Sequence, residues 1–155
     1  MKRKNLIAIK KVNKNKLIFK DQRILNYYKK FKSIVFKDIR NKNFAIAVSG
    51  GPDSLCLAYF SKMYASEFGN KIHVLIVDHN LRKESHQEAL KVKTILGQRR
   101  ILSKILSWKG KVPKSNIQRK ARDIRYAMLS NYCLKNKIEY LILRIMRTIK
   151  LKIFL

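Results

Sequence analysis

The chain has 155 residues and carries 37 Lys and Arg against 9 Asp and Glu, for a formal net charge of +28. This length suits one hydrophobic core, and no apolar run is long enough to cross a bilayer, so we expect a cytoplasmic protein without a membrane partner. The charge favours a polyanionic partner such as nucleic acid, because neutralising phosphates releases counterions, although lysine-rich coding in an A/T-rich genome is an alternative explanation.

The first part of the chain is basic. Residues 1–20 are rich in Lys and Asn and lack a clear period, so we expect a poorly ordered lead-in. From Asp21 onward, apolar residues recur at helical spacing at Ile24, Leu25, Tyr28, Phe31, Ile34 and Val35. This stripe predicts a helix with lysines on its other face, and packing on the domain explains it better than a role in RNA binding. We therefore assign residues 1–43 as a basic extension with one helix.

Strand and helix patterns then alternate as far as Leu143. The predicted strands are 44–48, 72–77, 100–108 and 138–143, and the predicted helices are 55–67, 84–96 and 116–135. Gly69 with Asn70, and then Gly97, are the expected stops of the first two of these helices. This order implies right-handed crossovers and an α/β fold with a doubly wound parallel sheet over residues 44–143. Ligands of such sheets bind at the carboxyl ends of the strands.

A hexapeptide, Ser-Gly-Gly-Pro-Asp-Ser, follows the first predicted strand at residues 49–54. A turn from a strand into a helix surrounds an anion with backbone N–H groups and the positive helix end, which predicts phosphate binding. A side chain at Gly50 or Gly51 would hold phosphate oxygens away from these donors, while the hydroxyls of Ser49 and Ser54 can donate. The loop is not a Walker motif, because it lacks the Gly-Lys-[Ser/Thr] ending.

Asp53 is unusual in a phosphate-binding loop. Its carboxylate would repel the ligand unless Mg²⁺ lies between the two negative groups. We therefore predict a metal-bridging role for Asp53, with helix capping as the alternative.

Two further segments accompany this loop. Val-Asp-His-Asn-Leu-Arg occupies residues 77–82, at the end of the second predicted strand, and Asn-Ile-Gln-Arg-Lys-Ala-Arg-Asp-Ile-Arg-Tyr occupies residues 116–126. The loop resembles the PP-loop of N-type ATP pyrophosphatases, which cleave ATP to AMP and pyrophosphate. The other two segments resemble the V-D-H-x-L-R and N-[IL]-[QE]-x-x-A-R-x-x-R-Y motifs of tRNA(Ile)-lysidine synthetases. The order and spacing of all three are similar to that family from about Phe44 to Leu143, which implies an adenine nucleotide alpha hydrolase-like fold.

The resemblance and the residues together give a set of expected site residues. The expected ATP-binding residues are Ser49, Gly50, Gly51, Pro52, Asp53 and Ser54, and the expected substrate- or phosphate-binding residues are Asp78, His79, Arg82, Arg122 and Arg125. Asp53 and Arg122 are the expected catalytic residues. Arg122 and Arg125 lie three apart on one helix face, where two guanidiniums can grip phosphates; solvated arginines are the alternative. A structural role for His79 is equally compatible with the sequence.

The resemblance implies a specific reaction. In this family the enzyme uses ATP and Mg²⁺ to adenylate the C2 oxygen of the wobble cytidine in a tRNA(Ile) with a CAU anticodon. The amine of free L-lysine then displaces AMP to form lysidine, which changes codon reading from AUG to AUA. The expected partners are therefore this tRNA and free lysine, while the oligomeric state stays open.

The end of the chain departs from the family pattern. After the fourth strand the family carries A-H-x-x-D-D-Q-x-E-[TN], but residues 144–155 contain no Asp or Glu. We interpret this stretch as an out-of-frame tail. A single base sequence encodes residues 144–153 in one frame and A-H-N-E-D-D-Q-A-E-N in the neighbouring frame. On this interpretation the domain is incomplete at its C-terminus, the tail is unsupported, and lysidine formation is weak or absent.

Two other functions stay open. A different PP-loop enzyme, such as a tRNA thiolase or an amidotransferase-type synthetase, would share the loop, but thiolases of this group usually carry CxxC pairs and the cysteines here, Cys56 and Cys133, lie far apart. A non-catalytic basic RNA-binding fragment of a decayed gene is the other alternative.

Overall fold

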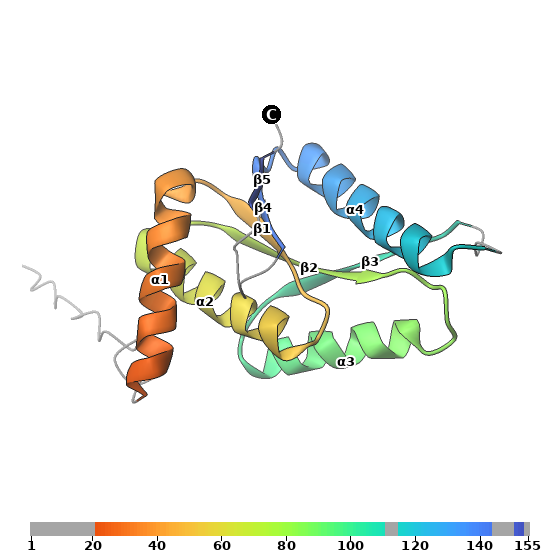
Figure 1. The fold of residues 1–155 in the computed structure, drawn as a ribbon, viewed down its shortest axis with the longest axis horizontal. Coiled ribbons are helices and arrows are strands. Elements are labelled where there is room, and N and C mark those ends of the chain that lie inside the picture. Colours follow the sequence, from red (N-terminus) through yellow and green to blue (C-terminus); the bar gives the residue numbers. More distant parts are fainter. Residues whose placement is uncertain (1–20, 111–114, 144–150, 154–155) are drawn as a thin grey trace, which may run out of the picture.

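The computed structural model describes residues 21–110 and 115–143 and the backbone of residues 151–153 (Figure 1). The lead-in expected over residues 1–20 lies outside these residues. The elements are α1 (Gln22–Ile39), β1 (Phe44–Ala47), α2 (Pro52–Phe68), β2 (Ile72–Asp78), α3 (Ser85–Gln98), β3 (Ser103–Ser107), α4 (Ile117–Lys135), β4 (Tyr140–Ile142) and β5 (Leu151–Ile153).

The strands form one sheet in the order β3-β2-β1-β4-β5. The first four in this order are parallel, which confirms the predicted parallel α/β fold. β5 departs from the expectation for the tail, because it pairs antiparallel with β4 in the register Tyr140↔Ile153, Leu141↔Lys152 and Ile142↔Leu151. Backbone hydrogen bonding thus places three residues of a tail expected to be unsupported at the edge of the sheet.

Helices cover both faces of the sheet (Figure 1). The larger hydrophobic cluster joins α1, α2 and α3 to one face of the sheet, and the smaller one joins Leu129 and Cys133 of α4 to the other. This division follows from right-handed crossovers, because the chain moves from β1 to β2 to β3 through α2 and α3 and then returns past β1 to β4 through α4. β1 is therefore the strand at which the direction of winding reverses.

The helix α1 packs on α2 through an aromatic contact. Tyr28, Phe31, Val35 and Ile39 are buried, whereas Ile24 and Ile34 of the predicted apolar stripe stay exposed. Glu67 of α2 accepts hydrogen bonds from the Tyr28 hydroxyl at 2.8 Å and from Lys32 Nζ at 2.9 Å. These bonds fix how α1 sits on the domain.

The largest differences from the predicted helix boundaries are at the start of α2 and the end of α3. Helix α2 begins at Pro52, three residues before the expected start, because proline at the first helical position loses no hydrogen bond. Gly97 does not end α3, which continues to Gln98; the left-handed position is taken instead by Arg100, at φ 56°. The Ile101 N–H donates to the Leu96 carbonyl at 2.9 Å and closes this turn. Among the helices in the described part of the chain, none is both long and apolar enough for a bilayer span.

Candidate functional site

The carboxyl ends of β1, β2 and β4 surround a cavity of about 280 Å³. Because β2 and β4 lie on opposite sides of β1, this is the switch point where open α/β sheets bind ligands. The polar and charged residues of the lining include Ser49, Ser54, His79, Arg82, Glu88 and Arg125. A second, more open cavity of about 400 Å³ shares Ser49, Ser54 and Leu143 and adds Gly51, Pro52 and Asp53. The structure thus brings the 49–54 loop and part of the two companion motifs to one place.

Gly50 is required for a reason that the sequence did not reveal. Its φ of +90° lies in the region that favours glycine, and a Cβ built there would come within 2.5 Å of Val92 Cγ2 in α3. Gly51 differs, because its φ is −70° and a Cβ there would meet no atom within 4 Å. We predicted that both positions are glycine because a side chain would occupy the space of a ligand. For Gly51 no contact with the described residues explains the glycine, so the space for a ligand stays a prediction there.

The Ser54 hydroxyl holds the loop in shape. Its Oγ accepts hydrogen bonds from the N–H groups of Gly50 at 3.1 Å and Ser49 at 3.2 Å, and donates to the Gly51 carbonyl at 2.9 Å. The N–H groups of Gly51, Asp53 and Ser54 have no acceptor among the described residues. They lie at the start of α2, where the helix dipole is positive, so they can receive the oxygens of an anion.

Asp53 lies in the first turn of α2 with an exposed carboxylate that lines the open cavity. Within residues 21–110 and 115–143, no group of three or more His, Cys, Asp or Glu side chains is placed to hold a metal ion. One carboxylate still fits Mg²⁺, since this ion is commonly held by one or two carboxylates together with substrate phosphates and water. The same position also lets Asp53 interact favourably with the helix dipole.

Asp78 is buried, with 3% of its surface exposed. Its carboxylate accepts hydrogen bonds from Ser85 Oγ at 2.7 Å, His86 Nδ1 at 3.0 Å and the Asn80 N–H at 3.0 Å. Burial raises the pKa of Asp78, but these hydrogen bonds outweigh burial and hold the pKa below its usual value. In this structure Asp78 therefore connects β2 to α3. The sequence did not identify Ser85 or His86 as its partners.

His79 lines the cavity, and one of its ring nitrogens is not hydrogen-bonded to any of the described residues. Its Nδ1 atom is buried and has no hydrogen-bond partner in the described part of the chain. Burial, followed by the charges of Arg125 and Arg82, lowers the pKa of His79 and so favours the neutral ring. Buried polar atoms are normally hydrogen-bonded, and a bound ligand would supply the missing partner.

The arginines of the two companion motifs occupy different positions. Both are exposed, but Arg125 lines the cavity, whereas Arg122 places its guanidinium over the Tyr126 ring, 5.7 Å from the centroid. Arg82 also lines the cavity and pairs with Glu88 at 3.3 Å, a contact of small energetic value because both side chains are more than half exposed. Of the two arginines expected to act together, only Arg125 is part of the cavity wall.

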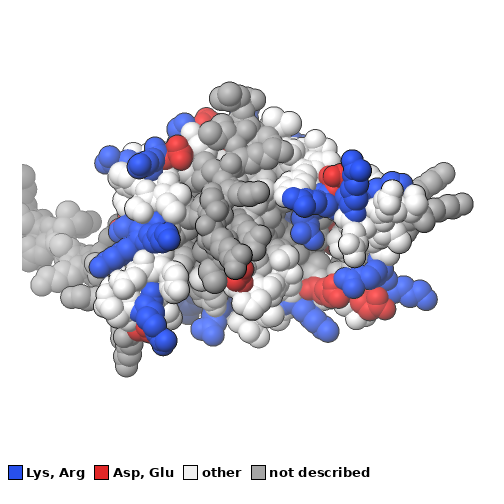
Figure 2. All heavy atoms as spheres, in the orientation of Figure 1, with Lys and Arg blue, Asp and Glu red and all other residues white. Residues whose placement is uncertain are grey.

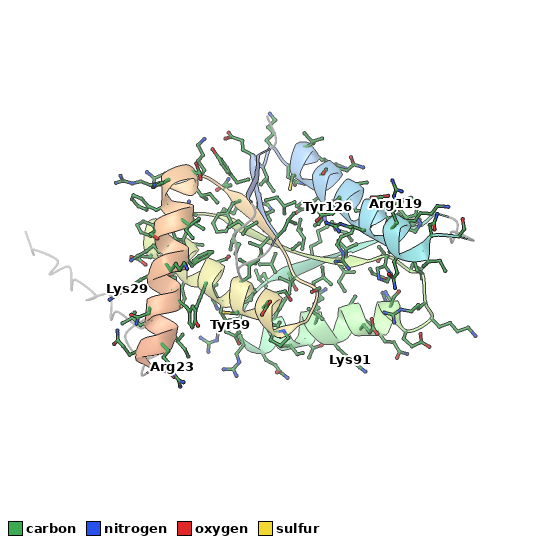
Figure 3. All side chains as sticks on the ribbon, viewed as in Figure 1. Arg23, Lys29, Tyr59, Lys91, Arg119 and Tyr126 are labelled. Atoms are coloured by element: carbon green, nitrogen blue, oxygen red, sulfur yellow. The ribbon has the colours of Figure 1, made fainter. Side chains whose placement is uncertain are left out.

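The surroundings of the cavity are charged. Figure 2 shows Lys and Arg side chains over α4 and a mixture of basic and acidic side chains over the start of α3. In Figure 3, Arg119 lies at the outer end of α4 and Tyr126 lies nearer the sheet. Basic side chains thus predominate on the outer surface over α4, and Arg125 is the basic residue of α4 that lines the cavity itself.

Comparison with known proteins agrees with this geometry. The family profile described as the PP-loop domain matches residues 22–147. The chain is 42% identical over 102 residues to a tRNA(Ile)-lysidine synthase of Orientia tsutsugamushi, covering 66% of this chain and 23% of that protein. It is 36% identical over 118 residues to the tRNA(Ile)-lysidine synthase of Rickettsia akari, covering 74% of this chain and 27% of that protein. The chain thus spans about a quarter of the length of these relatives.

A solved structure with a similar fold is the U34-tRNA thiolase of Methanococcus maripaludis with its [4Fe-4S] cluster, at a TM-score of 0.70 and 20% identity over 78% of this chain and 45% of that one. At this identity the likeness concerns the fold alone. The profile match, in contrast, covers most of the chain, from α1 to beyond β4, and includes all three motifs. The chain therefore belongs to the PP-loop domain family.

Proposed function

We propose that this chain is the ATP-binding domain of a tRNA-modifying enzyme of the lysidine synthetase type. The observation that carries the proposal is the 49–54 loop at the switch point of the sheet, with N–H donors at the start of α2 beside a cavity lined by His79 and Arg125. The names of the relatives and the three motifs support the same activity.

In the proposed reaction, the C2 oxygen of the wobble cytidine in tRNA(Ile) with a CAU anticodon attacks the α-phosphorus of ATP, and pyrophosphate leaves. The amine of L-lysine then attacks C2, AMP leaves with the oxygen, and a proton is lost from nitrogen. The product, lysidine, reads AUA in place of AUG. This sequence of steps consumes one ATP and needs no redox partner.

The residues of the site have distinct roles in this proposal. The N–H groups of Gly51, Asp53 and Ser54 bind oxygens of the leaving pyrophosphate. His79 offers its Nδ1 atom to a hydrogen-bond partner on the nucleotide, and Arg125 places positive charge at the cavity wall. Mg²⁺ bound through Asp53 would neutralise charge on the phosphates.

The segment after β4 limits the expected activity. Leu143 lines both cavities, so the chain leaves β4 beside the site, and residues 144–155 bring no Asp or Glu to it. We therefore propose that nucleotide binding is retained whereas lysidine formation by this polypeptide is weak or absent. The out-of-frame origin of residues 144–155 is part of this proposal.

Two measurements test the proposal. Calorimetric titration of the purified chain with ATP and Mg²⁺ measures binding, and ATP–[³²P]pyrophosphate exchange with tRNA(Ile) and lysine measures adenylation. Binding of ATP with little exchange is the expected result. A chain that binds RNA but not ATP would instead support a non-catalytic RNA-binding fragment.

The cysteines argue against a thiolase that depends on an iron–sulfur cluster. Cys56 packs against the hydrophobic core on the α2 face of the sheet, and Cys133 is buried in the hydrophobic core on the α4 face. Iron–sulfur clusters are held mainly by cysteine thiolates, and these two thiols lie on opposite sides of the sheet. The pair cannot ligate a common cluster.

A further inference from the structure

The exposed side of α1 carries an alternation of apolar and basic side chains. Tyr27, Lys30, Ile34 and Lys37 follow one another at spacings of three, four and three residues, so they share one face of the helix. We call these four residues the outer stripe of α1. Tyr27 is 60% exposed and Ile34 39% exposed, and both lysines are exposed.

The positive charge of this stripe is not neutralised within the described residues. Helix α1 contains five Lys and Arg residues and one acid, Asp38. Arg23 pairs with Asp21 and Lys32 pairs with Glu67, but neither Lys30 nor Lys37 has a carboxylate within 4 Å in the described part of the chain. Figure 2 shows Lys and Arg side chains following α1 on the left of the view.

We propose that the outer stripe of α1 is a docking surface for RNA, distinct from the nucleotide cavity; the proposal rests on the proposed function in that the RNA is the tRNA substrate. Lys30 and Lys37 are separated by about 10 Å along the helix axis, so their ammonium groups contact different phosphates. Tyr27 offers an aromatic face to an unpaired base. The stripe thus combines charge contacts with a stacking platform.

The arrangement of the elements favours RNA over an anionic membrane. A helix that lies in a bilayer surface needs a free apolar face, but Tyr28, Phe31 and Val35 are buried against the domain. Figure 1 also shows α1 on the far side of α2 from α3 and α4, between which the cavity lies. A ligand that contacts both the stripe and the cavity must be extended, as a folded RNA is.

The test compares two double variants that remove the same charge from different helices. Lys30→Gln with Lys37→Gln changes the stripe, and Lys91→Gln with Lys93→Gln changes exposed lysines of α3 (Figure 3 labels Lys91). Fluorescence anisotropy with a labelled tRNA(Ile) transcript measures affinity across a salt series. The slope of log K against log salt is negative, and in the stripe variant its magnitude should be smaller by roughly 1.5–2. Between about 50 and 200 mM salt, the factor by which affinity falls should therefore be roughly ten times smaller for the stripe variant than for the original chain. The α3 variant should keep the original slope.

A second variant tests the stacking contact. Tyr27→Ala should weaken tRNA binding about fivefold or more, while Tyr27→Phe should restore it. ATP binding should be unchanged in all of these variants, which separates failure of this inference from failure of the nucleotide site. Equal losses in the two lysine variants, absence of tRNA binding by the original chain, or a stripe-dependent loss seen only with phosphatidylserine vesicles would each overturn the inference.

Discussion

The contact between Gly50 and Val92 gives a prediction with a size that can be worked out. In Gly50→Ala the new Cβ meets Val92 Cγ2 at 2.5 Å, and alanine must also adopt a φ near +90°. The backbone conformation costs about 1–2 kcal/mol and the overlap in a packed region about 1–3 kcal/mol. The free energy of unfolding should therefore fall by roughly 2–5 kcal/mol, a large part of the stability of a small domain.

Two matched variants separate the two causes, and a third tests the space proposed for the ligand. Gly69→Ala adds a Cβ at φ +71° with no neighbour within 4 Å, so it should lose only the backbone part, about 1–2 kcal/mol. Val92→Ala combined with Gly50→Ala should remove the steric overlap, giving a favourable coupling energy of about 1–3 kcal/mol in a double-mutant cycle. Gly51→Ala should leave stability nearly unchanged but weaken ATP binding, because its Cβ enters the space proposed for the ligand. Urea unfolding and calorimetric titration measure the two quantities.

Two results would contradict these roles of Gly50 and Gly51. If Gly50→Ala destabilises the chain no more than Gly69→Ala, the contact with Val92 does not restrict the loop. If Gly51→Ala binds ATP as tightly as the original chain, the open space beside Gly51 is not where the phosphates bind.

The remaining predictions concern the other residues of the site. Ser85→Ala should destabilise the chain by about 1.5–3 kcal/mol at pH 7, because a hydrogen bond to a buried carboxylate is lost. The pKa of Asp78 is lower in the folded than in the unfolded chain, so the stabilisation by this carboxylate is complete above about pH 4 and disappears as the pH falls through the folded-state pKa. The free energies of unfolding of the original chain and of Ser85→Ala should therefore converge in acid. A difference that stays constant with pH would show that the lost stability does not come from the ionised Asp78. Arg125→Ala should weaken ATP binding about tenfold or more, and Arg122→Ala should weaken it less, because Arg125 lines the cavity and Arg122 does not; equal losses would show that Arg122 also reaches the nucleotide. With lysine and tRNA(Ile) the purified chain should release little AMP, and the bases after the Leu143 codon should encode the acidic motif in the neighbouring frame; robust AMP release, or bases without that motif, would count against the interpretation of residues 144–155.

Much of the fold could be predicted because each element has a local signature. The apolar runs over residues 44–48 and 72–77 are typical of strands buried on both faces, and the intervening helices have the length that parallel crossovers need. The differences between prediction and structure lie at the ends of helices, because tertiary contacts determine where a helix begins or ends. Gly97 is a plausible helix stop, yet burial of Ile101 and its hydrogen bond to Leu96 place the turn at Arg100.

In the candidate site, too, the local features could be predicted from the sequence, whereas contacts between separate elements could not. The 49–54 loop consists of six consecutive residues, so the order of strand, turn and helix around it could be predicted from the sequence alone, although the exact start of α2 at Pro52 could not. The surroundings of Asp78 could not, because Ser85 and His86 lie seven and eight residues away and reach its carboxylate only when α3 begins at Ser85. Arg122 and Arg125 look equivalent in the sequence, and only the docking of α4 brings one of them to the cavity.

The sequence by itself determined the order of the elements from α1 to β4 and the positions of the three motifs, because hydrophobic period and glycine placement act over a few neighbouring residues. The tertiary structure decided which side chains of separate elements meet: Val92 against Gly50, Ser85 and His86 on Asp78, and Arg125 at the cavity wall. These contacts depend on how helices cross the sheet, and that arrangement is set by burial of the whole core rather than by any single segment.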